Sequence, residues 1–116
     1  MTELAEILKA LGDETRFNIL LTLLYHDFCV GALAKRLNLT ESAISQHLRI
    51  LRNAGIVRGD KRGYYTHYRV DRDALKKLAD KLVELSHMEP LKTQCRKHNS
   101  DNHSCCRKEV GNNDTG

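Results

Sequence analysis

The sequence lacks the features that mark membrane, secreted and catalytic chains. No apolar run approaches the roughly 20 residues that a membrane-spanning helix requires. No basic start followed by a long apolar stretch marks a secretory signal. The chain also has no nucleophile–base constellation, no glycine-rich phosphate loop and no cofactor motif. We therefore expect a cytoplasmic protein that is neither inserted in a membrane nor an enzyme.

The chain is short and has few cysteines, but three of its four cysteines lie close together. Its 116 residues leave room for one hydrophobic core, and the sequence has no internal repeats. Thiols stay reduced inside a cell, so clustered cysteines there bind a metal or sense redox state more often than they form structural disulfides. Cys95, Cys105 and Cys106 form such a cluster near the C-terminus.

Positive charge is concentrated in one stretch of the sequence. The formal net charge of the whole chain is +4. Residues 49–72 contain seven Lys or Arg residues and two Asp residues, so this segment carries +5 and the rest of the chain −1. A concentrated cationic segment favours a polyanion as the partner.

Hydrophobic periodicity predicts five helices. They are a first helix over residues 4–11 that ends at Gly12, a second capped by Asp13, a third over residues 30–37, a fourth capped by Thr40 that runs to about Ala54 and stops at Gly55, and a fifth that starts near Asp71. The first and last of these carry apolar stripes that a partner subunit can bury.

Between the fourth and fifth helices the pattern alternates with a period of two, which is typical of strands. "IVRGDKRGYYTHYRV" (residues 56–70) predicts two short strands around a turn from Gly59 to Gly63, with Lys61 and Arg62 at its tip. The element order is that of a winged helix-turn-helix, a mainly α fold with a β-hairpin wing. We expect this domain to span residues 1–90, followed by a flexible Cys- and His-containing tail over residues 91–116.

The fourth helix has a polar face opposite its apolar stripe. Ile44, Leu48 and Leu51 share the inward stripe. The outward side chains expected to contact DNA are Ser42, Ser45, Gln46 and Arg49, joined by Lys61 and Arg62 of the hairpin. His47 projects beside Ile44, away from Arg49, and is expected to brace the helix rather than contact a base.

Three stretches together resemble the ArsR/SmtB family of metal-responsive repressors. They are "LKALGDETRFNILLTL", "CVGALAKRLNLTESAISQHLRILRNAGIV" and "KRGYYTHYRVD", and the resemblance covers about residues 4–87. It implies a homodimeric winged-helix repressor that binds double-stranded operator DNA and leaves it when an inducer binds.

The two metal sites that the resemblance implies are incomplete in this sequence. In the third-helix thiolate site Cys29 is present, but Gly31 and Ala34 replace the other cysteines. At the last-helix site an ungapped alignment brings non-ligands into the ligand positions, namely Arg72, Ala74, Leu85 and Met88. A shift of one residue gives Asp71, Asp73, Glu84 and His87, a carboxylate-rich set that we interpret as a lost site. Asp71 and Asp73 are better explained as acids in the first turn of a helix.

The tail offers another ligand set, C-x₂-H-x₄-H-x-C-C. Cys95, Cys105 and Cys106 supply three thiols, which suit the trigonal pyramidal geometry of As(III) or Sb(III). Two of these cysteines with His98 and His103 would instead form a tetrahedral zinc site, and Cd(II) and Cu(I) also prefer thiolates. Our first hypothesis is therefore a repressor released by a thiophilic ion held in the tail.

Two other functions fit parts of the sequence. A redox- or persulfide-sensing repressor would pair Cys29 or Cys95 with the tail thiols, whose reactivity the nearby Arg and Lys residues would favour. A metal-buffering protein would use the same tail, but it leaves the polar helix face and the wing without a role.

Overall fold

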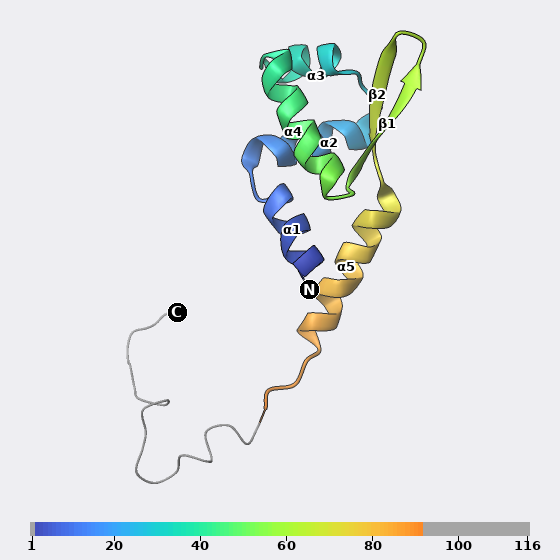
Figure 1. Cartoon of the computed structure of the whole chain (residues 1–116). Coiled ribbons are helices and arrows are strands. Elements are labelled where there is room, and N and C mark those ends of the chain that lie inside the picture. The colour runs from blue at the N-terminus through green and yellow to red at the C-terminus, as the bar shows by residue number, and fades with distance from the viewer. Residues whose placement is uncertain (1, 92–116) are drawn as a thin grey trace, which may run out of the picture. The chain divides into compact units, whose positions relative to one another are not determined.

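The computed structural model describes residues 2–91, and the helices and strands lie in residues 2–86 (Figure 1). The elements are α1 (Thr2–Leu11), α2 (Glu14–Tyr25), α3 (Val30–Leu37), α4 (Glu41–Asn53), β1 (Val57–Arg62), β2 (Tyr65–Val70) and α5 (Arg72–Ser86). This order confirms the winged helix-turn-helix that the sequence predicts. Within the described residues, the helices are all too short or too polar to cross a bilayer.

Local side-chain contacts explain where the helices begin and end. The Asp13 carboxylate accepts the N–H of Arg16 at 3.0 Å and caps α2, and the Thr40 hydroxyl accepts the N–H of Ala43 at 3.1 Å and caps α4. Gly55 follows α4 with a φ of +82°, a conformation in which a side chain would be strained. Both caps and this stop are as the sequence predicts.

The core lies between α2, α3, α4 and the base of the hairpin. Its fully buried side chains are Ile19, Leu33, Ile44, Leu48, Leu51 and Ile56. Three of these six come from α4, whose inward stripe is therefore confirmed. Burial of each such side chain contributes about 1.5–3 kcal/mol, so the core fixes the rotation of α4 about its axis and turns its polar face outward.

The hairpin turn differs from the sequence prediction. The strands continue to Arg62 and Tyr65, which pair directly, so the loop is Gly63–Tyr64 rather than residues 59–63. Gly63 has a φ of +68°, as the first central residue of a type II′ loop does. Lys61 and Arg62 are thus the last two residues of β1 and point to opposite faces of the hairpin.

Gly59, which the sequence placed in the turn, lies inside β1 opposite Tyr68. A Cβ at this position would lie 3.0 Å from the Tyr68 ring and 3.0 Å from the Thr66 methyl. This glycine therefore marks a close approach of the two strands. The pattern of a glycine between polar residues did not distinguish the two situations, because both favour glycine.

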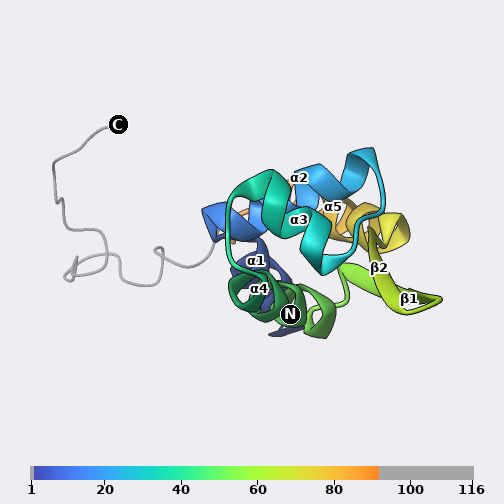
Figure 2. The same cartoon turned by 90° about the horizontal axis from the view of Figure 1, so that it is seen from above.

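A third segment pairs with the outer edge of the hairpin. The link between α2 and α3 passes β2, where Phe28 N donates to Tyr68 O at 3.3 Å and Tyr68 N donates to Phe28 O at 2.8 Å. The Phe28 ring also lies 4.9 Å beneath the guanidinium of Arg36 in α3. Figure 2 shows the hairpin projecting to one side of the helices from this attachment. The wing is therefore held to the helix-turn-helix by main-chain bonds.

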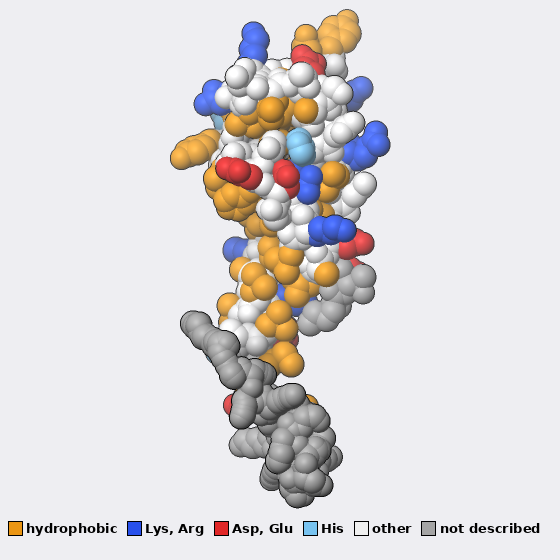
Figure 3. Space-filling model, turned by 90° about the vertical axis from the view of Figure 1, so that its left-hand side faces the viewer, with side chains coloured by type: hydrophobic (Ala, Val, Ile, Leu, Met, Phe, Trp, Pro, Cys, Tyr) orange, Lys and Arg blue, Asp and Glu red, His pale blue; other side chains and the backbone are white. Residues whose placement is uncertain are grey.

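Apolar side chains are exposed on α1 and α5. Leu8, Leu82, Val83 and Leu85 are 42, 42, 54 and 38% exposed, respectively, while only Leu78 of α5 is buried. Figure 3 shows hydrophobic side chains gathered over the lower part of the domain, where α1 and α5 lie in Figure 1. The apolar stripes predicted for the first and last helices are thus present, and the rest of the described part of the chain does not cover them.

Candidate nucleic-acid interface

The polar face of α4 is exposed and is presented by a tight turn. All four expected contact residues, Ser42, Ser45, Gln46 and Arg49, are exposed. Asn38 follows the end of α3 and turns the chain with a φ of +57°, and the Leu39 N–H bonds back to the Ala34 carbonyl at 2.9 Å. α4 starts two residues later. This is the geometry with which a second helix enters a major groove.

His47 lies outside the exposed polar face of α4, as predicted, on the flank of the helix that meets Arg16 of α2. Its Nδ1 lies 3.4 Å from Nη1 of Arg16, and the ring is half-buried. Arg16 also donates from Nε to the Ala10 carbonyl at 2.6 Å, at the end of α1. His47 therefore connects α4 to the rest of the domain and does not belong to the exposed polar face.

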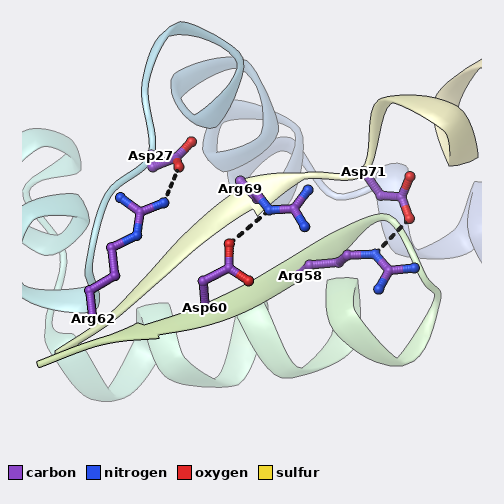
Figure 4. Close-up of polar contacts among 6 residues, drawn as sticks. All are labelled: Asp27, Arg58, Asp60, Arg62, Arg69 and Asp71. Atoms are coloured by element: carbon purple, nitrogen blue, oxygen red, sulfur yellow. Dashed lines mark hydrogen bonds and ion pairs between the residues drawn. The ribbon is translucent and has the colours of Figure 1, made fainter.

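The arginines of the hairpin are bound by carboxylates. Figure 4 shows three ion pairs in a row along one face of the hairpin: Asp27–Arg62, Asp60–Arg69 and Asp71–Arg58, with N–O distances of 2.7, 2.9 and 2.8 Å. The alternation in β1 brings Arg58, Asp60 and Arg62 to this face together. Arg72 donates to the Leu24 carbonyl at 2.9 Å. Much of the charge concentrated in residues 49–72 is thus engaged within the protein.

These contacts shift the acid–base equilibria of two of the carboxyls. The hydrogen bond from Arg69 lowers the pKa of Asp60 and raises the pKa of Arg69. The hydrogen bond from Arg58, followed by that from the Ala74 N–H, lowers the pKa of Asp71. Asp71 therefore also caps α5, which agrees with its interpretation as an acid at a helix start rather than a metal ligand.

The cations that remain for a polyanion are fewer than the sequence suggests. Arg49, Arg52 and Lys61 are exposed and make no ion pair with the side chains that the structure describes. The hairpin residues 57–70 carry four cations and one carboxylate, a formal charge of +3, which Asp27 and Asp71 reduce to +1. Sequence reasoning missed Asp27 because it is 35 residues away from Arg62.

The described part of the chain offers no metal centre. Among residues 2–91 no group of three or more His, Cys, Asp or Glu side chains is placed to hold an ion. Cys29 is a free, half-buried residue directly before α3. The expected ligands Cys95, Cys105 and Cys106, with His98 and His103, lie outside the described residues. They remain a prediction from the sequence.

A helix-turn-helix with an exposed polar second helix and an attached hairpin defines a DNA-binding winged helix-turn-helix protein. Residues 13–58 match the model of the bacterial regulatory proteins of the arsR family. With the relatives described next, this match shows that the chain belongs to the arsR family of transcriptional regulators. The resemblance seen in the sequence is confirmed, and so is the expectation that the protein is not an enzyme.

Three relatives illustrate the similarity. The transcriptional activator HlyU of Vibrio cholerae is 38% identical over 79 residues, which cover 68% of this chain and 73% of HlyU. The arsenical resistance operon repressor of Escherichia coli K12 is 38% identical over 66 residues, 56% of each chain. The solved structure of an ArsR-like transcriptional regulator from Rhodococcus sp. RHA1 is 38% identical with a TM-score of 0.70, over 73% of this chain and 80% of that one.

Proposed function

We propose that the protein is a homodimeric, cytoplasmic repressor that binds a pseudo-palindromic operator and releases it when a thiophilic ligand binds. The observation that carries DNA binding is the exposed polar face of α4, held outward by three buried residues. Ser42, Ser45 and Gln46 have the donors and acceptors that base edges require, and Arg49 can bind guanine with two hydrogen bonds. Lys61 and Arg62 at the end of β1 would contact the backbone or the neighbouring minor groove.

The exposed apolar side chains of α1 and α5 support a dimer. Four large apolar side chains are more than a third exposed on these two helices, which is costly on a domain of this size unless a partner covers them. The same patch on two copies can meet across a twofold axis. A dimer of this kind presents two α4 helices to two half-sites about one helical turn of DNA apart.

In this proposal, residues 1–90 bind DNA and dimerise, and residues 91–116 bind the inducer. Cys95, Cys105 and Cys106 provide three thiolates, which As(III) and Sb(III) favour. The name of the E. coli relative, an arsenical resistance repressor, supports this choice. With His98 and His103 the same segment suits Zn(II), while Cd(II) and Cu(I) share the preference for thiolates.

Persulfide or redox sensing by the same thiols is the second candidate. Arg96, Lys97, Arg107 and Lys108 stand next to the tail cysteines in the sequence. Neighbouring cations favour the reactive thiolate form. Both candidate functions use the same DNA-binding domain. They differ in whether the tail thiols bind a thiophilic ion or are modified by an oxidant or a persulfide.

One titration separates these alternatives. The full-length protein first selects its operator from a random duplex library, and fluorescence anisotropy then follows the bound duplex as As(III), Sb(III), Zn(II), Cd(II), Cu(I) or a persulfide donor is added. Release by As(III) or Sb(III) at stoichiometric concentration supports the proposal. Release by the persulfide donor alone supports the second candidate, and failure to select any duplex contradicts both.

A further inference from the structure

We propose that Asp27 competes with DNA phosphates for Arg62 and thereby sets the affinity of the wing for DNA. This inference rests on the proposed DNA-binding function and names a residue that limits it. The Arg62 Nη2 atom lies 2.7 Å from Oδ2 of Asp27, a distance typical of a charge-assisted hydrogen bond. A carboxylate and a phosphate present similar oxygen acceptors to a guanidinium, so only one of them can hold Arg62 fully.

The position of Asp27 is fixed by the fold. It lies between the end of α2 and Phe28, whose backbone exchanges two hydrogen bonds with Tyr68 of β2. The Phe28 ring also contacts the His26 ring, with ring centroids 5.2 Å apart, and the Arg36 guanidinium. The backbone beside Asp27 is therefore already bonded to β2, which holds the carboxylate next to the hairpin face. Arg62 reaches this carboxylate from the end of β1 (Figure 4).

Arg62 differs from the other two hairpin arginines in where it lies. In the strand register Arg58 lies opposite Arg69, next to the buried Val57–Val70 pair at the base of the hairpin. Arg62 lies opposite Tyr65, directly before the loop. The side chains of Arg62 and Asp27 are 49 and 31% exposed. Arg62 is thus the hairpin arginine nearest the projecting end, in a pair that solvent and a phosphate can reach.

Exchange of one anion for another has a definite thermodynamic signature. When a free cation binds a DNA phosphate, the dependence of log affinity on log salt steepens by about 0.9. When Arg62 leaves Asp27 for a phosphate, the freed carboxylate attracts a cation from solution. This uptake of a cation cancels much of the steepening of the salt dependence. The Asp27→Asn variant should therefore bind DNA about two- to fivefold more tightly at low salt, the range expected for one exposed ion pair. Its salt slope should steepen by up to about 0.9.

The test is a double-mutant cycle in the full-length protein. The wild type, Asp27→Asn, Arg62→Gln and the double variant are titrated with one mixed-sequence duplex between about 50 and 200 mM salt. A mixed-sequence duplex suffices because the proposed contact is to phosphate. The gain of affinity and the steeper slope caused by Asp27→Asn should disappear when Arg62 is Gln.

The matched control is Asp60→Asn, which makes the same change of charge on the same face but releases Arg69 nearer the base. An equal gain from Asp60→Asn, or a gain from Asp27→Asn that survives in the Arg62→Gln background, would show a general charge effect and overturn the inference. No gain from Asp27→Asn overturns it too. If the wild type binds no duplex at all, selected or mixed, the proposed function itself fails, and the inference with it.

Discussion

The Arg16 side chain joins the end of α1, through His47, to helix α4, whose exposed face we propose for DNA binding. Its Nε donates to the Ala10 carbonyl at 2.6 Å, and its Nη1 lies 3.4 Å from the His47 ring nitrogen. The backbone N–H of the same residue is bonded to Asp13, the cap of α2. One residue of α2 thus contacts both α1, which carries an exposed apolar side chain, and α4, the proposed DNA-binding helix.

Replacement of Arg16 by Gln should lower the free energy of unfolding by about 1–3 kcal/mol. The reason is that the last carbonyls of α1 lose a charged donor in a partly buried site. Urea denaturation of the variant measures the change. Arg52→Gln is the matched control, since Arg52 is exposed on α4 and should shift stability by no more than about 0.5 kcal/mol. A loss no larger than that of the control would show that the contacts of Arg16 do not stabilise the domain.

Stability should fall in acid, and the capping aspartate Asp13 should contribute to the fall. The N–H of Arg16 holds the pKa of Asp13 below its ordinary value. The stabilisation that the ionised Asp13 carboxylate gives the fold is therefore fully present above the pKa of aspartate in the unfolded chain, about 3.9. It is lost as the pH falls through the lower folded value. Asp13→Asn keeps an oxygen that can cap α2, so the unfolding free energy of this variant should decline less steeply below about pH 4.

Chemical denaturation across this pH range tests the expectation, with Glu14→Gln as the control in the same first turn. Glu14 is exposed and accepts no hydrogen bond from the described part of the chain. An acid limb of Asp13→Asn as steep as that of the wild type would contradict the proposed linkage. Asp71, which caps α5 and whose pKa is also lowered, should behave like Asp13.

The sequence predicts what depends on local chemistry and misses what depends on distant contacts. The caps Asp13 and Thr40 were predictable because a cap bonds to a backbone group only three residues away. The hairpin loop was misplaced because Gly59 and Gly63 both lie in a polar stretch, and only strand pairing separates a close approach from a turn. The Asp27–Arg62 pair joins residues 35 apart and leaves no periodic signal.

The candidate DNA-binding residues divide in the same way. The exposure of Ser42, Ser45, Gln46 and Arg49 followed from helical periodicity, because buried Ile44 and its stripe fix the rotation of α4. Net charge was a poorer guide for the hairpin. A net charge counted from the sequence does not show which charged side chains bind one another. In the fold, carboxylates from outside the hairpin, Asp71 and Asp27, bind Arg58 and Arg62.

Arg49 and Arg62 should have different effects on DNA binding. Arg49→Ala should weaken binding to the selected operator more than to mixed-sequence DNA, by about 1–3 kcal/mol for a lost base contact. Arg62→Gln should weaken both to a similar extent, because a phosphate contact carries no base information. Anisotropy titrations with both duplexes measure the ratio. Equal ratios for the two variants would refute this division of roles.

A charge in the apolar stripe of α5 should prevent dimerisation. Leu82 is 42% exposed in one chain, and Leu82→Glu would have to bury an unpaired carboxylate in the proposed interface. Sedimentation equilibrium should show a monomer and anisotropy a much weaker operator complex. Lys77→Glu, about 140° around the helix, is the control and should remain dimeric. A Leu82→Glu variant that still dimerises like the wild type would place the interface elsewhere.

The C-terminal tail should be needed for induction but not for DNA binding. The described residues form a buried hydrophobic core among themselves, so a protein without residues 92–116 should fold, dimerise and bind its operator as before. It should no longer release DNA when As(III) is added. An ion shifts the equilibrium only if it binds the DNA-free state more tightly than the bound one, and we place its ligands in the tail. Single Cys95→Ser, Cys105→Ser and Cys106→Ser changes should impair release, whereas Cys29→Ser should matter less. Normal release from the truncated protein in the same anisotropy assay would move the sensor to the domain, where Cys29 would be the first residue to test.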